Sequence, residues 1–201
     1  MRTRILPVVM AVALIAGCSL GKAVPQTTMY VIASPAAAAL PPVRRIAETL
    51  RVGNVRVAGP FAGDALVYRF SDVRYSSDPY HAFVSDPGEM LGGRVAEWLD
   101  RAGGFRAVAQ PGSARPAAYV LEIMVAELYG DFRAGRAPAA VLAMQFALID
   151  QAGPRPALRY EGSISRSIDL PQAAPEDLVR GYGKALAEIL AQLSAELSAQ
   201  L

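Results

Sequence analysis

The sequence predicts an α+β fold, in which an antiparallel sheet carries two main helices packed on one face. Residues 158–168 alternate between apolar and polar side chains, as in a strand with one buried and one solvated face. Residues 86–102 and the segment from about residue 175 instead place apolar side chains at helical spacing. The resulting order of strands, helix, strands and helix indicates an α+β fold.

Residues 1–17 have the composition of a secretory signal peptide. Arg2 and Arg4 form a basic start, and the apolar run that follows is far shorter than the roughly 20 residues that span a bilayer. Ala16 and Gly17 are the small residues expected before a cleavage site. We therefore expect this segment to be removed.

Cys18 follows directly and is the only cysteine in the chain. It has no second cysteine for a disulfide, and nothing in the sequence places the only histidine, His81, beside it as the base of a catalytic thiol. The segment Ile15-Ala16-Gly17-Cys18 resembles a bacterial lipobox. The resemblance implies cleavage before Cys18, a diacylglyceryl group on its sulfur and an acyl chain on its new amine; no other cofactor is predicted. The alternative is an ordinary signal peptide with an incidental cysteine.

A lipidated Cys18 would be a lasting tether, because two or more acyl chains anchor a protein stably. Ser19, where retained lipoproteins carry aspartate, resembles a signal for the outer membrane, so we expect the protein on its periplasmic face. Residues 18–42 are interpreted as the lipidated N-terminus and tether, and residues 43–201 as a single domain. Without residues 1–17 the chain has 18 basic and 18 acidic side chains, which gives no electrostatic argument for nucleic-acid binding.

Several short strands are predicted before the first helix. Residues 29–32 (MYVI) are expected to pair as an edge strand, although they lie within the tether. Residues 52–57 form the next strand, which ends at Gly59-Pro60, and residues 66–70 form another. The segment 72–75 either continues that strand or turns back beside it.

The first helix is expected to begin after Asp86. The segment Asp86-Pro87-Gly88-Glu89 combines a capping residue, a proline at the first helical position and a glutamate three residues after the cap. Gly103 and Gly104 supply a left-handed stop. The apolar side chains between these signals share one face: Met90, Leu91, Val95, Trp98, Leu99 and Ala102.

Three longer strands are predicted at residues 119–128, 140–149 and 158–168. In the first of them, Glu122 and Glu127 are five residues apart, so a bulge between them would restore one polar face. The buried face of the third is expected to hold Leu158, Tyr160, Ile164 and Ile168.

The chain ends in a second helix, from about Pro175. Gly181 and Gly183 weaken its first turns by about 1 kcal/mol each relative to alanine. Its apolar stripe is interpreted as core, although its last two members could reach a neighbouring subunit: Leu178, Tyr182, Leu186, Ile189, Leu193 and Leu197.

No set of side chains indicates an enzyme. A single histidine excludes a multi-histidine metal site, and nucleophile-elbow, phosphate-loop and dinucleotide motifs are absent from the sequence. Glu176 and Asp177 suit the first turn of a helix, where negative charge interacts favourably with the helix dipole. Glu122 and Glu127 are interpreted as solvated strand residues rather than as functional carboxylates.

Residues 75–83 concentrate three aromatic side chains and the only histidine just before the first helix. The segment could be a packed connector whose aromatic side chains cover the sheet edge or the helix that contains Trp98. Alternatively, it is a loop that presents Tyr75, Tyr80, His81 and Phe83 to a partner protein or lipid, because aromatic residues are enriched in binding hot spots.

The order of these motifs resembles the ABC-type transport auxiliary lipoproteins, the PqiC/YmbA-like family, over about residues 26–195. A lipobox precedes a Met-Tyr-Val-Ile strand, Gly-Pro-Phe and Leu-Val-Tyr-Arg segments, a Tyr-x4-Tyr-His element and an Asp-Pro-Gly-Glu-Met-Leu helix that ends at Gly-Gly-Phe. Where the family commonly has Tyr-x-x-Trp, this chain has Tyr80-His81-Ala82-Phe83. The resemblance therefore does not assign a role to any one ring in this segment.

The resemblance implies an outer-membrane-anchored partner of a periplasmic MCE-domain protein, which works with an ABC transporter to move lipids across the periplasm. It also implies association into homo-oligomeric rings. A lipid carrier with its own cavity between sheet and helices is the alternative, motivated by the apolar strands at residues 119–128 and 140–149. A purely structural envelope lipoprotein is a third hypothesis.

Overall fold

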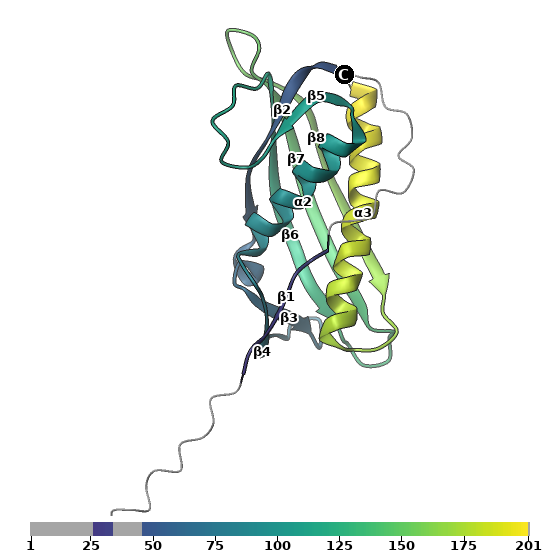
Figure 1. Ribbon diagram of the computed structural model, residues 1–201. Coiled ribbons are helices and arrows are strands. Elements are labelled where there is room, and N and C mark those ends of the chain that lie inside the picture. Colours follow the sequence, from purple (N-terminus) through teal and green to yellow (C-terminus); the bar gives the residue numbers. More distant parts are fainter. Residues whose placement is uncertain (1–25, 34–45, 201) are drawn as a thin grey trace, which may run out of the picture.

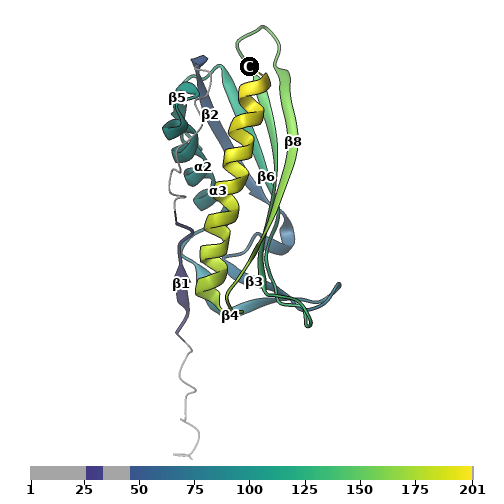
Figure 2. The ribbon, with the colours of Figure 1, turned by 90° about the vertical axis from the view of Figure 1, so that its right-hand side faces the viewer.

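The structure, a computed structural model, describes residues 26–33 and 46–200 (Figure 1). Its eight strands form one sheet, and helices α2 (Pro87–Ala102) and α3 (Pro175–Gln200) lie together on one side of it (Figure 2). The α+β class and the two helices on one face are therefore as the sequence predicts. Within the described part of the chain, no helix is long and apolar enough to cross a membrane.

Four strands precede α2: β1 (Thr28–Tyr30), β2 (Ile46–Val57), β3 (Ala65–Arg69) and β4 (Tyr75–Phe83). The predicted edge strand is confirmed, since β1 lies at the end of the sheet and pairs with β4. The chain turns back after β3, so β3 and β4 form an antiparallel hairpin. A short 3-10 helix, Gly59–Phe61, connects β2 to this hairpin.

The expectation of a connector or loop at residues 75–83 is wrong, because this segment is strand β4. Ser76, Ser77, Asp78 and Pro79 make its sequence look like a loop. Its pairing with β3 shifts register between the Val67–Ser77 and Ala65–Ala82 pairs. Such an irregularity accommodates a proline that could not donate to a regular ladder.

Helix α2 begins and ends where the sequence predicts. The Asp86 side chain accepts a hydrogen bond from the Glu89 backbone N–H at 3.0 Å, and Pro87 occupies the first turn. The helix stops at Gly103, whose φ of 69° lies in the left-handed region that glycine adopts without strain. Leu91, Val95, Trp98 and Leu99 are all buried.

Four strands follow: β5 (Phe105–Ala109), β6 (Tyr119–Asp131), β7 (Ala139–Asp150) and β8 (Ala157–Asp169). The β6–β7 register shifts between Val125 and Glu127, which confirms the predicted bulge. Strand β5 was not predicted, because its alternating alanines give little hydrophobic contrast.

Leu158 was expected on the buried face of β8, but it is 58% exposed. The register explains the difference, since Tyr160 lies opposite Leu148 whereas Leu158 lies opposite the next residue, Ile149. The extra residue, Arg159, forms a bulge that turns Leu158 to the opposite face from Tyr160.

The sheet is mixed rather than wholly antiparallel. Strands β6, β7 and β8 form an antiparallel meander, and β3 pairs antiparallel to β4. In contrast, β2 pairs parallel to both β5 and β6, β3 pairs parallel to β6, and β1 pairs parallel to β4. Alternation of polar and apolar residues reveals a buried face but not the direction of the neighbouring strand, so the parallel pairs could not be predicted from it.

The apolar stripe of α3 packs on the sheet as predicted, and its six members are 0–2% exposed. Gly181 has a specific role in this packing. A Cβ atom placed there would lie 2.6 Å from the Ala140 Cβ and 2.7 Å from the Leu170 Cδ2. The missing side chain therefore allows the start of α3 to approach β7 closely.

This contact predicts opposite effects of alanine at two neighbouring glycines. Gly181→Ala should lower the free energy of unfolding by about 1–3 kcal/mol, because the overpacking outweighs the better helix propensity. Gly183→Ala should raise it by up to about 1 kcal/mol, since its Cβ would lie 3.8 Å from the nearest atom, the Ala33 carbonyl oxygen. Urea denaturation of both variants measures the difference, and equal stability of the two would contradict the packing role of Gly181.

Candidate functional site

The four residues predicted to bind a partner, Tyr75, Tyr80, His81 and Phe83, all lie on β4. The predicted lipidation site, Cys18, lies outside the described residues. Because successive side chains of a strand point to opposite faces of the sheet, β4 divides these four residues between two environments.

Phe83 is a core residue. It is 3% exposed, and its ring centroid lies 6.3 Å from that of the buried Tyr182 on α3. We therefore remove Phe83 from the candidate surface, because a partner could not reach it in this fold.

Tyr80 belongs to an exposed apolar patch at the sheet edge. Met29 pairs in register with Ala82, and alternation along β1 and β4 places Val31, Tyr80 and Val84 on the same face as this pair. Except for the buried Ala82, these side chains are 47–63% exposed. We call Met29, Val31, Tyr80 and Val84 the β1–β4 patch.

The opposite face of β4 holds a polar cluster around Asp78. The Tyr68 hydroxyl donates to Asp78 Oδ2 at 2.7 Å, and His81 Nδ1 lies 2.7 Å from the same oxygen. The Tyr80 backbone N–H donates to Asp78 Oδ1 at 2.8 Å. The His81 ring also lies against that of Tyr30, with 5.9 Å between centroids.

These contacts keep Asp78 ionised. Burial acts to raise the pKa of Asp78, but the hydrogen bonds from Tyr68, Tyr80 and His81 together hold that pKa below its ordinary value. The pKa of Tyr68 is raised, first by burial and then by its hydrogen bond to Asp78. An ionised carboxylate only accepts, so His81 Nδ1 carries a proton in this arrangement.

The cluster holds β4 in place through the contacts of Asp78 with Tyr68, Tyr80 and His81. Among the described residues, no serine or cysteine hydroxyl or thiol is bonded to His81, so the aspartate–histidine pair lacks a nucleophile. The same part of the chain contains no group of three histidine, cysteine, aspartate or glutamate residues that could hold a metal ion.

Removal of the Asp78 carboxylate should destabilise the β4 region. Asp78→Ala leaves Tyr68 and His81 without their acceptor and should lower the free energy of unfolding by about 2 kcal/mol at neutral pH. Because the folded pKa of Asp78 is below the unfolded value of about 3.9, this stability is present above about pH 4 and is lost as pH falls through the folded pKa. The gap between wild type and variant should therefore close in acid.

Urea titrations at neutral and acidic pH measure this gap. The matched control is Asp64→Ala, an exposed aspartate whose loss should change stability by less than about 0.5 kcal/mol. A deficit for Asp78→Ala that persisted unchanged below the folded pKa would show that its carboxylate charge is not the stabilising group.

Tyr75 joins an aromatic cluster on the face of the sheet away from the helices. Its ring lies edge-on to Tyr129 at 5.4 Å and to Phe61 at 6.2 Å, and Phe61 stacks on Tyr129 at 5.7 Å. The Arg69 guanidinium lies 5.6 Å from the Tyr75 ring centroid and 5.9 Å from that of Tyr129. Tyr75 is 40% exposed, so it has both a packing role and an accessible edge.

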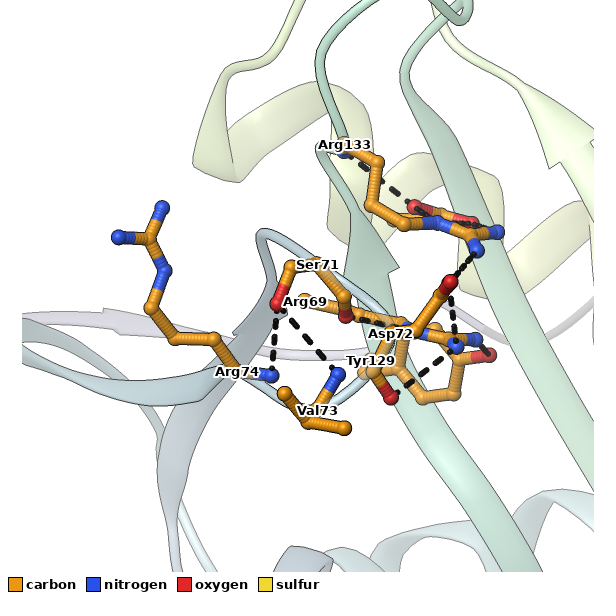
Figure 3. A network of polar contacts seen from close by, with 8 residues as sticks. Arg69, Ser71, Asp72, Val73, Arg74, Tyr129 and Arg133 are labelled. Atoms are coloured by element: carbon orange, nitrogen blue, oxygen red, sulfur yellow. Dashed lines mark hydrogen bonds and ion pairs between the residues drawn. The ribbon is translucent and has the colours of Figure 1, made fainter.

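The loop between β3 and β4 is tied to the end of β6 by ion pairs (Figure 3). Arg133 Nη1 lies 2.7 Å from Asp72 Oδ1, and Arg133 also contacts Asp131 through Nη2 at 2.6 Å. Arg69 reaches the same Asp72 oxygen at 3.3 Å and donates to the Tyr129 hydroxyl at 3.3 Å. The pKa of Asp131 is lowered mainly by its hydrogen bond from Arg133.

A groove of about 460 Å³ lies on the sheet face away from the helices. Glu122 and Glu161 face it from β6 and β8, together with Arg56 and Gln145. A Cβ at Gly53 would lie 3.0 Å from Glu122 Oε1, so this glycine makes room for the carboxylate. The interpretation of Glu122 as a solvated strand residue is consistent with this position.

Sequence reasoning missed Met29, Val31, Val73 and Val84 as surface residues. Their exposure depends on which strand covers each position, and the sequence pattern does not show this. Val73 did carry a signal, since valine is unusual between Asp72 and Arg74 in a turn.

A family model matches most of this chain, and solved structures of other proteins share its fold. The family model for the "ABC-type transport auxiliary lipoprotein component" matches residues 30–194. The crystal structure of protein XCC0632 from Xanthomonas campestris, of family DUF330, is similar with a TM-score of 0.70 and 16% identity, over 89% of this chain and 96% of that one. The hypothetical protein CT253 from Chlamydia trachomatis is similar with a TM-score of 0.56 and 8% identity, over 77% and 98% of the two chains. No curated protein sequence matches this chain.

Proposed function

Because the chain belongs to the family of ABC-type transport auxiliary lipoprotein components, we propose that it is an outer-membrane lipoprotein that docks onto a periplasmic MCE-domain protein of a lipid-transport system. The family associates the protein with an ABC transport system and describes a transport component rather than an enzyme. The observation that supports docking is the β1–β4 patch, where four large apolar side chains lie exposed together.

The anchor in this proposal is Cys18, with the acyl chains in the inner leaflet of the outer membrane. Gln26, the first described residue, is eight positions after Cys18. An extended chain covers at most about 3.6 Å per residue, so the domain would stay within about 30 Å of the bilayer. The patch begins three residues after Gln26 and is therefore held near the membrane.

Mass spectrometry of the N-terminal peptide tests the anchor. The protein from a bacterial envelope should begin at Cys18 and carry the mass of a diacylglyceryl group and an amide-linked acyl chain. Cys18→Ala should accumulate with residues 1–17 still attached, because the modified cysteine is what the cleavage requires. A mature N-terminus at another residue, or an unmodified Cys18, would contradict the anchor.

Pull-down of the tagged protein from detergent-solubilised envelopes tests docking. We expect MCE and ABC components to elute with wild type and to be reduced on the order of tenfold or more by Met29→Ser combined with Tyr80→Ala, as for truncation of hot-spot residues. Leu158→Ala is the matched control, because Leu158 is as exposed as the patch residues but lies on β8. If the envelopes contain these components but the eluate does not, the result would contradict the proposal.

The alternative of a lipid carrier receives less support from the packing. The pocket between sheet and helices at Ile46, Phe105 and Leu197 has a volume of about 20 Å³, room for about one water molecule. Cavities that hold small-molecule ligands are typically about 300–1,000 Å³. Native mass spectrometry of gently extracted protein distinguishes the two, since a carrier would retain a lipid that is not covalently attached.

A further inference from the structure

Val73 is the most exposed large apolar side chain of the described residues, at 91%. It lies at the tip of the β3–β4 hairpin, in a short loop where glycine, asparagine, aspartate and serine are the usual residues. Valine supplies neither the side-chain hydrogen bonds nor the backbone freedom that favour the usual turn residues. Exposure of its apolar side chain to water is also unfavourable in free energy. The neighbouring Phe70 is also exposed, at 36%.

The loop that presents Val73 is ordered by its own hydrogen bonds (Figure 3). The Ser71 hydroxyl oxygen accepts from the backbone N–H groups of Val73 and Arg74, at 3.4 and 3.0 Å. The Phe70 N–H donates to the Arg74 carbonyl oxygen at 2.9 Å. Together with the Arg133–Asp72 ion pair, these bonds hold Val73 outward on a supported tip rather than on a frayed loop.

The tip is also basic. The two acids of the joined loops, Asp72 and Asp131, are both paired with Arg133. Arg74 lies over the Phe70 ring, 5.4 Å from its centroid, and Arg136 is exposed in the β6–β7 loop. Among the described residues, no acidic side chain forms an ion pair with Arg74 or Arg136, so the tip combines exposed apolar groups with two arginines outside any ion pair.

The tip lies at the end of the molecule from which the N-terminal chain arrives. Strand β1 runs parallel to β4, with Thr28 beside His81 and Tyr30 beside Phe83. The hairpin tip directly precedes β4, and β1 runs in the same direction as β4. The chain therefore enters β1 at the end of this strand pair that faces the tip. Figures 1 and 2 both place β1, β3 and β4 at the end of the molecule opposite the C-terminus.

We propose that this tip, residues 70–74 with the adjoining β6–β7 loop, is a membrane-contact site that rests on the bilayer to which Cys18 is tethered. Val73 and Phe70 enter the headgroup region, and Arg74 and Arg136 bind anionic headgroups, as apolar and basic side chains do at membrane surfaces. The inference rests on the proposed lipid anchor for its choice of bilayer over protein. Two points of attachment, acyl chains and tip, would fix how the domain is oriented on the membrane.

Tryptophan quenching tests the contact. Val73→Trp is attached to vesicles of phosphatidylethanolamine and phosphatidylglycerol with brominated acyl chains, through a hexahistidine tag that replaces residues 1–18 and binds a nickel-chelating lipid. The truncated chain keeps the entire described fold, whose core runs from Ile32 to Leu197. The native Trp98 is 2% exposed and gives a constant background. Leu158→Trp, at an exposed leucine near the other end of the sheet, is the control.

We expect the emission of Val73→Trp to shift to shorter wavelength and to be quenched, while that of Leu158→Trp stays unchanged. Adding Arg74→Glu and Arg136→Glu should weaken the quenching, because each positive charge removed lowers the equilibrium constant for membrane contact by on the order of fivefold. Since the tag replaces the acyl chains, this result does not depend on whether Cys18 is lipidated. An unquenched Val73→Trp, or equal quenching at both positions, would overturn the proposal. So would cross-linking of a photoreactive residue 73 to an envelope protein instead of lipid.

Discussion

The packing of α3 against the sheet is the constraint on which the rest of the structure depends. Six side chains of its apolar stripe are almost fully buried, and Gly181 allows the helix to lie directly on β7 at Ala140. With α2 beside it, this helix covers one face of the sheet and contributes a long apolar stripe to the core. Among the described residues, no long helix covers the opposite face of the sheet, and the edge formed by β1 and β4 carries exposed apolar side chains (Figure 2).

The β4 strand links this core to the surface. On one side Phe83 packs against Tyr182 of α3, and on the other Tyr80 and Tyr75 are exposed. Asp78 fixes the strand between these two sides through Tyr68 and His81, so the exposed residues are held on a rigid support. A partner would meet a preformed surface, which lowers the entropy lost on binding. The β3–β4 hairpin tip and the β1–β4 patch lie at the same end, so the proposed orientation on the bilayer and the proposed docking would reinforce each other.

Much of this arrangement could be predicted where the signal is local. The Asp86 cap, the Gly103 stop, the α3 stripe and the β6 bulge each follow from residues within a few positions of one another. The parallel pairing of β2 with β5 and β6 could not, because it is decided by contacts distant in sequence. Strand β4 was predicted as a connector or loop because it is rich in polar residues. Some of these residues form the Asp78 cluster, and others lie at the edge of the sheet. The division of Tyr80 and Phe83 between two faces follows from the alternation of side chains along a strand, so it could be predicted only once the segment is known to be a strand.

Hydrogen–deuterium exchange of the vesicle-attached protein, with and without the proposed MCE-domain partner, tests most directly whether the β4 end is where the protein makes its contacts. The account predicts slower exchange on partner binding in β1 and β4, slower exchange on vesicle attachment in residues 70–74, and no change in residues 151–156 between β7 and β8. Protection confined to residues 151–156 or to β8, with β1 and β4 unchanged, would contradict it.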